Sequence, residues 1–427
     1  MKLANAFTLL FFIVLLVYSH TSAAQTAAAA LPNASSVKGV IASLGQKNAY
    51  TFTASVGEFV FLRVGEPDRS SFFPAVTVTA PNGTRFGYDD GREVAQINGR
   101  IEVAGEYSVV VRERSDDQVG RYVIELVRVP GANELGPVSE ADPVEDEIGV
   151  GDIDSYTLNA SAGEALHVHI SDFNRTGLVP RVDVFGPDGS SLASSSGPTV
   201  GSLRTRATRS GLHSIIVRDD SRSSGDTGND DGAGPYRLYV AGIPGANEHG
   251  VLTNGGVASQ NIDVGDIDTY TFRASSGERI FLQIADPTSA DLVPEVWLYA
   301  PSGEALDVSS GLSVGSFRVS ASETGTYTVL VRDNSRNSGS TANDDATGSY
   351  KLYLATAPGA SEFGLQRSGA RIADFIDVGD LDSFTFVARQ GERINLTLTR
   401  TSGDRADRFR AACIHPVQKL TVRTMEI

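Results

Sequence analysis

The stretch that decides the fold is GDIDSYTLNASAGEALHVHI, which runs from Gly151 to Ile170. It returns as GDIDTYTFRASSGERIFLQI at Gly265–Ile284, 114 residues later, and its opening returns as GDLDSFT from Gly379, after the same interval. After the small-residue turn, apolar and polar residues alternate, which predicts a strand with one face in a core. An interval of this length indicates tandem domains rather than a solenoid of small units.

The rest of each repeat also has a β pattern. The segments VPRVDVFGPDG and VPEVWLYAPSG read as strands that end in Pro/Gly turns, and PGANELG, PGANEHG and PGASEFG mark the joints between repeats. No long stretch has helical periodicity. We therefore expect an all-β fold of antiparallel β-sandwiches, of jelly-roll or immunoglobulin-like type, with about 100 residues per unit as an independent core requires.

The repeats divide the chain into three complete sandwiches and one partial one. We expect repeat 1 at 36–136, repeat 2 at 137–250, repeat 3 at 251–364 and the partial repeat 4 at 365–400. Repeat 1 lacks eight residues between Arg112 and Tyr122, where repeat 2 has the acidic segment DDSRSSGDTGNDDGAGPY (Asp219–Tyr236). The segment 401–427 departs from the template, and we interpret it as the product of a truncation or frameshift.

Composition and the N-terminus point to an exported protein. The chain has 427 residues, 41% of them hydrophobic, and a formal net charge of −16, which argues against binding of nucleic acid. Residues 1–24 have the pattern of a signal peptide, with Lys2 before the apolar run Phe7–Val17. An uncleaved anchor is the alternative, although the run is short for a membrane span. After cleavage we expect no membrane span and a secreted or cell-surface location.

The repeats resemble the bacterial pre-peptidase C-terminal domain family. The resemblance rests on the GDIDSYT opening, the strand SAGEALHVHI, the segment VDVFGPDG and the closing strand GPYRLYV. It covers repeats 2 and 3, repeat 1 with a degraded opening, and only the start of repeat 4. It implies a secreted β-sandwich of the kind appended to exoenzymes, and some such relatives hold Ca²⁺ and bind matrix or polysaccharide.

Acidic and amide side chains recur at the start of each repeat, and oxygen ligands of this kind are what Ca²⁺ prefers. The resemblance implies that linker acids and opening-loop aspartates act together, so these positions are our candidate metal ligands. They are Asn133, Glu134, Asp152 and Asp154 at the opening of repeat 2, Asn247, Glu248, Asp266 and Asp268 at the opening of repeat 3, and Glu362, Asp380 and Asp382 at the opening of repeat 4, with the asparagines and glutamates on the preceding linkers. Repeat 1 reads GQKNAY there and lacks the pair.

The acidic loop is a second candidate for cation binding. Its oxygen-bearing residues are Asp219, Asp220, Asn229, Asp230 and Asp231 in repeat 2, and Asp333, Asn334, Asn343, Asp344 and Asp345 in repeat 3. The alternative for both clusters is an ordinary exposed turn, because Asp, Asn, Ser and Gly are common in turns. Neither the EF-hand spacing nor the Gly-rich RTX repeat is present.

Catalytic candidates are weak, and we predict that the chain is not an enzyme. GLSVG (Gly311–Gly315) matches the hydrolase elbow but falls between strands. His167 and His169 share a strand face and could bind a metal, but repeat 3 has other residues there, so surface chance is the preferred interpretation. Cys413 and His415 have no assignable partners.

Three functions remain open. The leading one is a secreted, non-catalytic binding or adhesion array, with Ca²⁺ stiffening the linkers and an extracellular protein or polysaccharide as partner. The first alternative is the spacer region of a truncated secreted peptidase or other exoenzyme. The second is a carbohydrate-binding array, for which an outward-pointing Trp297 would serve, although a residue at a domain interface or rim is the preferred interpretation of that tryptophan. The sequence does not indicate an oligomeric state.

Overall fold

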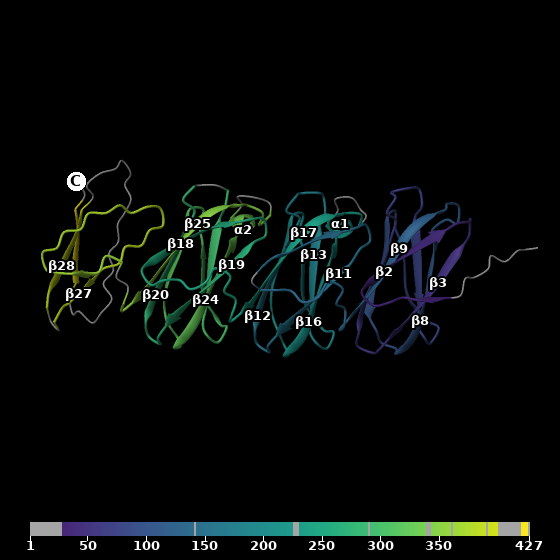
Figure 1. Cartoon of the computed structure of the whole chain (residues 1–427), viewed down its shortest axis with the longest axis horizontal. Coiled ribbons are helices and arrows are strands. Elements are labelled where there is room, and N and C mark those ends of the chain that lie inside the picture. The colour runs from purple at the N-terminus through teal and green to yellow at the C-terminus, as the bar shows by residue number, and fades with distance from the viewer. Residues whose placement is uncertain are drawn as a thin grey trace, which may run out of the picture.

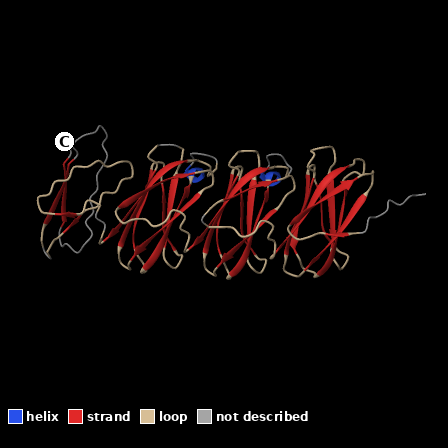
Figure 2. Cartoon of the chain, in the orientation of Figure 1, coloured by secondary structure: helices blue, strands red, loops and turns tan. Residues whose placement is uncertain are grey.

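The computed structural model describes residues 28–140, 142–224, 230–288, 291–338, 343–359, 362–389, 392–399 and 420–425. In these ranges regular structure is almost entirely strand, and the two helices, α1 (Ser221–Ser224) and α2 (Ser335–Ser338), have four residues each (Figure 2). The all-β prediction is confirmed. None of the helices in the described ranges has the length and hydropathy of a membrane span. The predicted signal peptide, Asn229, Cys413 and His415 lie outside the described residues.

Each complete repeat is a sandwich of two sheets. The strands of repeat 1 are β1 (Ala29–Ala30), β2 (Ser35–Ile41), β3 (Lys47–Ala54), β4 (Phe59–Gly65), β5 (Pro74–Thr79), β6 (Arg85–Asp90), β7 (Val94–Arg100), β8 (Gly105–Glu113) and β9 (Gly120–Val129). Those of repeat 2 are β10 (Val144–Ile148), β11 (Asp154–Ala160), β12 (Ala165–Ser171), β13 (Pro180–Phe185), β14 (Ser191–Ser196), β15 (Val200–Arg206), β16 (Gly211–Asp219) and β17 (Gly234–Ile243). Those of repeat 3 are β18 (Gly256–Ile262), β19 (Ile267–Ala274), β20 (Arg279–Ala285), β21 (Pro294–Tyr299), β22 (Ala305–Ser310), β23 (Val314–Ser320), β24 (Gly325–Asp333) and β25 (Gly348–Ala357).

The strand order identifies the sandwich as a jelly roll. In repeat 2 one sheet has the order β10-β17-β12-β15 and the other has β11-β16-β13-β14, all antiparallel. The first strand thus pairs with the eighth and the second with the seventh, which is the double Greek key of a jelly roll. Repeats 1 and 3 have the same order, and in repeat 1 the short β1 adds a parallel partner to β3.

The core of each sandwich lies between its two sheets and contains a pair of bonded tyrosines. Alternate residues of β12 (Leu166, Val168 and Ile170) fill the core of repeat 2, as their spacing predicts. The hydroxyls of Tyr156 and Tyr236 meet there at 2.5 Å, and the other complete repeats have an equivalent pair. Buried hydroxyls need such partners because leaving them unpaired costs free energy.

The repeats stack side by side in a single row, with the flat faces of neighbouring sandwiches in contact (Figure 1). This stacking explains a difference from the sequence pattern. Alternation predicts one polar, exposed face for β12, yet all seven of its residues are buried, because the second face packs against repeat 3.

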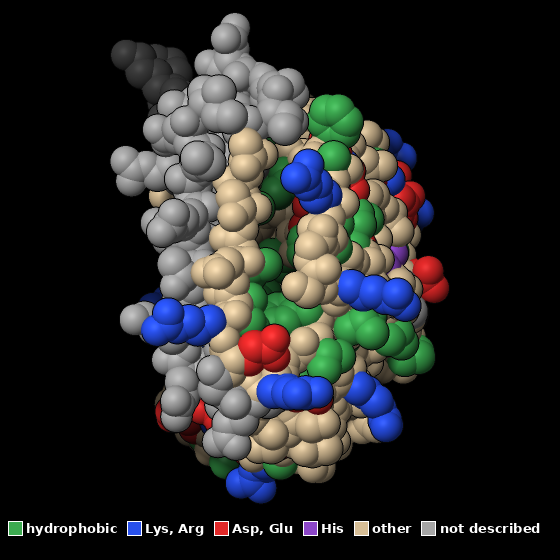
Figure 3. Space-filling model, turned by 90° about the vertical axis from the view of Figure 1, so that its left-hand side faces the viewer, with side chains coloured by type: hydrophobic (Ala, Val, Ile, Leu, Met, Phe, Trp, Pro, Cys, Tyr) green, Lys and Arg blue, Asp and Glu red, His purple; other side chains and the backbone are tan. Residues whose placement is uncertain are grey.

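The partial repeat 4 contains only short strands in the described ranges. These are β26 (Leu365–Gln366), β27 (Thr385–Phe386), β28 (Ile394–Thr399) and β29 (Leu420–Met425), joined as two parallel pairs. Several of its apolar side chains are exposed, with Phe375 at 83% and Val387 at 81%. Hydrophobic side chains are visible on the surface when the array is viewed from this end (Figure 3).

Candidate functional sites at the junctions between repeats

The junctions between repeats are apolar at their centres. Between repeats 1 and 2, Phe61 from β4 and Val127 from β9 pack against Phe185 and Ile216 of the next repeat. Between repeats 2 and 3, Tyr239, Ala241 and Ile243 lie on one side, and Tyr299 and Leu330, at the positions of Phe185 and Ile216, lie on the other. Because these side chains are almost fully buried, each junction is a small hydrophobic core of its own.

A repeated hydrogen bond ties each repeat to the opening loop of the next. Arg63 Nη1 donates to the carbonyl of Asp152, His169 Nδ1 to that of Gly265, and Gln283 Nε2 to that of Asp380. The three donors occupy the same position of their repeats. The glycine of the GDxD motif is required here, because a Cβ on Gly151 would overlap the backbone of Gly65 in the preceding repeat.

The acidic loop of repeat 2 is organised around the carboxylate of Asp219. Its two oxygens accept hydrogen bonds from the backbone N–H groups of Val179, Ser221 and Gly232 and from the hydroxyl of Ser221. Asp333 makes the matching bonds in repeat 3. In repeat 1, Glu113 holds the shorter connection through the N–H groups of Ser115 and Asp117.

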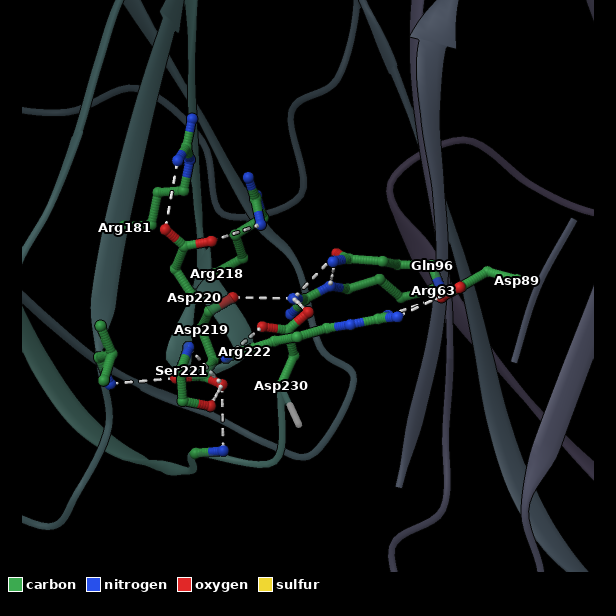
Figure 4. Close-up of polar contacts among 12 residues, drawn as sticks. Arg63, Asp89, Gln96, Arg181, Arg218, Asp219, Asp220, Ser221, Arg222 and Asp230 are labelled. Atoms are coloured by element: carbon green, nitrogen blue, oxygen red, sulfur yellow. Dashed lines mark hydrogen bonds and ion pairs between the residues drawn. The ribbon is translucent and has the colours of Figure 1, made fainter. Parts of the chain in front are cut away.

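The same loop also bonds to the preceding repeat (Figure 4). Arg63 of repeat 1 enters it, with Nη2 3.2 Å from Asp230 Oδ2 and donating to the carbonyl of Asp219 at 2.8 Å. Both side chains of this ion pair are at most 1% exposed. In return, Arg222 from the loop pairs with Asp89 of repeat 1 at 2.8 Å.

The acidic loop of repeat 3 makes an equivalent contact with repeat 2, through other residues. Arg175 of repeat 2 pairs with Asp345 in the loop of repeat 3, at the position where Arg69 donates to the carbonyl of Asp231. In the described part of these loops, protein donors therefore engage the carboxylates of Asp219, Asp230 and Asp345. This arrangement favours a role in docking over cation binding, which stays a prediction for this loop.

The asparagines and aspartates among the candidate ligands at the repeat openings fall into three structural groups. The first is the amides, since Asn133 and Asn247 accept hydrogen bonds from the hydroxyls of Thr157 and Thr271. The second is the leading aspartates of the GDxD motifs, which close the turn by accepting backbone N–H bonds. Asp152 accepts from Gly149 and Ile153, Asp266 from Asp263 and Ile267, and Asp380 from Leu381.

The third group is the second aspartates of the motif, which in repeats 2 and 3 bond to the buried tyrosine pair. Tyr236 donates to Asp154 Oδ2 at 2.5 Å, and Tyr350 donates to Asp268 Oδ2 at 2.5 Å. In repeat 1 the same position is Asn48, whose amide donates to Tyr122. The position thus has a structural role that does not depend on a metal.

The junction of repeats 1 and 2 gathers carboxyl groups from both repeats. Glu125, a fully buried residue of β9, accepts a hydrogen bond from the N–H of Ile153 through Oε2, whereas its Oε1 is buried with no donor. Burial and the neighbouring Asp152 raise the pKa of Glu125 to about 10, and the same two causes raise that of Glu134 to about 7. Burial also raises the pKa of Asp154 to about 8, although Tyr236 opposes this.

Residues of this carboxyl cluster could hold a hard divalent cation. An acceptor oxygen that is buried without a donor, beside carboxylates that repel one another, is the environment that a bound cation or a shared proton relieves. Glu125, Glu134 and Asp152 would be the residues that hold Ca²⁺. The counterparts of Glu125 in repeats 2 and 3 are Tyr239 and Tyr353, so the next junctions lack this carboxylate.

The openings of repeats 3 and 4 differ from that of repeat 2. At repeat 3, burial and Asp268 raise the pKa values of Glu248 and Asp266 to about 7 each. The residue after Glu248 is His249, which pairs with Asp268. At repeat 4, burial and Asp380 raise the pKa of Asp382 to about 6 and shift that of the exposed Glu362 upward.

The preferred interpretation of His167 and His169 as surface residues is wrong. They are 2% and 3% exposed, in the junction with repeat 3, where His167 Nε2 lies 2.6 Å from the hydroxyl of Tyr299. Burial lowers the pKa of His169 to about 3 and that of His167 well below its usual value. The prediction failed because this face of β12 packs against repeat 3. The alternating pattern of one repeat does not reveal that contact.

Trp297 lies at a domain interface, which was the preferred interpretation from the sequence. Its ring stacks beside Tyr299 and lies under the guanidinium of Arg204, 4.7 Å from the ring centroid, while Nε1 donates to Glu295. GLSVG forms the turn after β22 and the first two residues of β23, so it joins two strands, as expected from the sequence, and is not a strand-to-helix elbow.

Among the junction residues that sequence reasoning missed are Arg63, Glu125 and His249. Arg63 and Glu125 sit on strands of repeat 1, where no aligned repeat has the same residue, so comparison of the repeats could not find them. His249 could have been found, because PGANEHG differs from PGANELG by this one residue.

Comparisons with known proteins add a modest result. No protein family model matches the chain, and no curated protein matches it. Among solved structures, the chain is similar to the pre-peptidase C-terminal domain of collagenase from Bacillus anthracis, at 14% identity and a TM-score of 0.21, over 23% of this chain and 94% of that one. It is also similar to PliG of Aeromonas hydrophila, a periplasmic inhibitor of g-type lysozyme, at 15% identity and a TM-score of 0.19, over 25% and 93% of the two chains. A triple jelly-roll protein of an archaeal virus matches over 76% of this chain and 83% of its own, at 12% identity and a TM-score of 0.16.

Proposed function

We propose that the chain is a secreted, non-catalytic binding or adhesion array of β-sandwiches of pre-peptidase C-terminal type, in which Ca²⁺ stiffens the junction between repeats 1 and 2. The observation that carries the calcium part of the proposal is the buried Oε1 of Glu125, which has no donor and lies among the carboxyl groups of the next repeat. A cation there would bind residues of both repeats at once. It would therefore stabilise the contact between them by mass action.

The continuous junctions support a rod that holds its repeats in fixed positions. Such a rod suits a protein that presents binding surfaces to an extracellular protein or polysaccharide, because pre-organised surfaces lose less entropy on binding. The location of Trp297 inside a junction removes the feature that favoured a carbohydrate-binding array.

Thermal melting of the full chain in millimolar Ca²⁺ and in EDTA tests the calcium part. We expect Ca²⁺ to raise the Tm, and we expect Glu125→Gln to remove most of this rise because it takes away a charged ligand of the same shape. Glu147→Gln, at an exposed position of β10, is the matched control and should keep the full rise. Equal Tm values in Ca²⁺ and EDTA for the unchanged protein would overturn this part.

The binding part is tested separately. Immobilised extracellular-matrix proteins and polysaccharides would be probed with the full chain in Ca²⁺ and in EDTA. Saturable binding supports the adhesion array, with a loss in EDTA expected if the stiff junction matters. Failure to bind any member of either class would favour the spacer alternative.

A further inference from the structure

The start of repeat 3 carries a group of metal-binding side chains that differs in chemistry from the other junctions. Ligand atoms of Glu248, His249 and Asp268 all lie within 4.8 Å of one another. His249 Nε2 is 2.9 Å from Asp268 Oδ1 and 3.9 Å from Glu248 Oε1. The side chain of Asp268 is 2% exposed, and those of the other two are about one quarter exposed, so the group is held by the fold and is open on one side.

Contacts on every side orient these three side chains. The backbone N–H groups of Glu248 and His249 donate to the hydroxyl and the carbonyl of Thr269, which fixes the chain at both positions. The imidazole of His249 packs against the ring of Tyr270 at 5.3 Å. The hydroxyl of Tyr350 donates to the second carboxylate oxygen of Asp268. Oriented side chains favour metal binding because little entropy is lost when the ion arrives.

The amide of Gln260 lies where a supporting partner of a metal-bound histidine is expected. Its side-chain nitrogen is placed 3.3 Å from His249 Nδ1. The oxygen and nitrogen of an amide exchange places on a flip, and the oxygen would accept the Nδ1–H of the ring. That bond leaves Nε2, the atom that faces the two carboxylates, as the free ligand, which is the usual arrangement around a metal-bound histidine.

The imidazole changes which metal suits the site. Ca²⁺ and Mg²⁺ are held by oxygen, whereas imidazole nitrogen with carboxylates suits Zn²⁺ and other first-row transition ions. The residue at this position is Leu135 in repeat 2 and Phe363 in repeat 4, so the nitrogen ligand belongs to repeat 3. A hollow about the size of one water molecule, lined partly by Glu140 and Asp142, adjoins Glu248 and offers room for a water ligand.

We propose that Glu248, His249 and Asp268 form a binding site for a divalent transition-metal ion, with Zn²⁺ as the first choice, at the junction of repeats 2 and 3. The site deepens the proposed function, because a metal would again stabilise a repeat junction. It does not include Glu125, so the experiments on the calcium site and on this site can give independent results.

The test uses metal-free full chain, titrated with Zn²⁺ by calorimetry and with Co²⁺ by its visible absorption. Two variants borrow residues from other repeats, which protects the fold. His249→Leu takes the residue of repeat 2, and Asp268→Asn takes that of repeat 1, where Asn48 still bonds to the tyrosine pair. Circular dichroism should show that both variants keep the strand content.

We expect one Zn²⁺ and one Co²⁺ site that each variant weakens at least tenfold, the lower end of the loss seen when even supporting groups of metal sites are removed. Glu125→Gln should leave Zn²⁺ binding unchanged. Because Cys413 and His415 could also bind Zn²⁺, the deciding quantity is the difference between the unchanged chain and the variants. Equal Zn²⁺ affinity in His249→Leu, or no Zn²⁺ binding by the unchanged chain at micromolar concentrations, would overturn the proposal and leave His249 and Asp268 as an ion pair.

Discussion

The ion pair between Arg63 and Asp230 shows how single residues couple two repeats. Burial raises the pKa of Asp230 even though Arg63 lowers it, which indicates that desolvation offsets much of the attraction between the charges. Buried pairs of this kind contribute little net stability, but breaking one leaves an uncompensated charge. The pair therefore specifies how the loop docks more than it strengthens the junction.

We expect Arg63→Met to loosen the junction of repeats 1 and 2 by about 3–5 kcal/mol, the usual cost of removing one partner of a buried pair. Combining it with Asp230→Leu should recover much of the loss, because no charge is then left buried. Hydrogen exchange of the acidic loop and of β4 measures the opening free energy. Arg209→Ala, which breaks an exposed pair with Asp188, is the control and should change little. Additive effects of the two substitutions would contradict this account.

The histidines of β12 make the junction of repeats 2 and 3 sensitive to acid. His169 has a pKa of about 3 in the fold and about 6.5 when unfolded, so between these values the unfolded chain binds more protons. The contribution of His169 to the free energy of unfolding is therefore fully present above pH 6.5 and is lost as the pH falls toward 3. The loss at low pH is on the order of 5 kcal/mol at most, since each pKa unit corresponds to about 1.4 kcal/mol.

We expect the Tm of the full chain to fall between pH 7 and pH 4.5, and the fall to be smaller when His167→Phe and His169→Gln are combined. These are the residues of repeat 3, Phe281 and Gln283, and Gln283 makes the same inter-repeat hydrogen bond. An equal fall in the variant would show that other groups cause the acid sensitivity.

At the scale of elements, the acidic loop is a docking arm. Repeats 2 and 3 both have the loop, and both use it to contact the repeat before them. In repeat 1, which no other sandwich precedes in the described residues, Glu113 closes a shorter connection with the same kind of anchor. The length of the loop thus follows from its contact with a neighbour.

Replacing Asp219–Gly234 by Glu113–Gly120 should remove the docking arm while keeping a closed turn. We expect repeat 2 to keep its strand content, and small-angle X-ray scattering to show a less rigid array, because the bonds of Arg63 to the loop are lost. The same exchange at Asp333–Gly348 should loosen the next junction. Unchanged scattering from both variants would mean that the apolar junctions alone keep the array stiff.

The strands and the repeats could be predicted from the sequence because each follows from local alternation and a fixed interval. Local patterns indicate a β-sandwich but not its jelly-roll strand order, since strand pairing depends on contacts between residues far apart in the chain. At the junctions, GDxD marks the loop that accepts hydrogen bonds from the preceding repeat, yet Glu125 comes from that preceding repeat and was missed. Likewise, His167 and His169 read as exposed because nothing local reveals that a neighbouring domain covers them.

At the scale of the molecule, the outer faces of the repeats differ in a way that suits an array. Phe185 and Tyr299 cover the face that meets the preceding repeat, whereas repeat 1 has Thr79 at the same position. A polar outer face is what a terminal repeat needs to remain soluble. We therefore expect repeat 1 to act as a cap for the repeats that follow it.

This difference predicts what happens when the cap is removed. A chain that begins at Pro130 would expose Phe185, Ile216 and Ile153, a contiguous apolar surface of the kind that drives association. We expect this shortened chain to form dimers or larger species in sedimentation experiments and to bind a hydrophobic dye, whereas the full chain should do so less.

The matched control carries Phe185→Thr, the residue of repeat 1, in the shortened chain. We expect it to reduce association, because a threonine hydroxyl at the centre of the face disfavours burial against a second copy. In the full chain the same substitution should instead weaken the junction, by about 3–5 kcal/mol if it resembles other losses of a large buried aromatic. A shortened chain that stays monomeric with Phe185 in place would show that repeat 1 does not act as a cap.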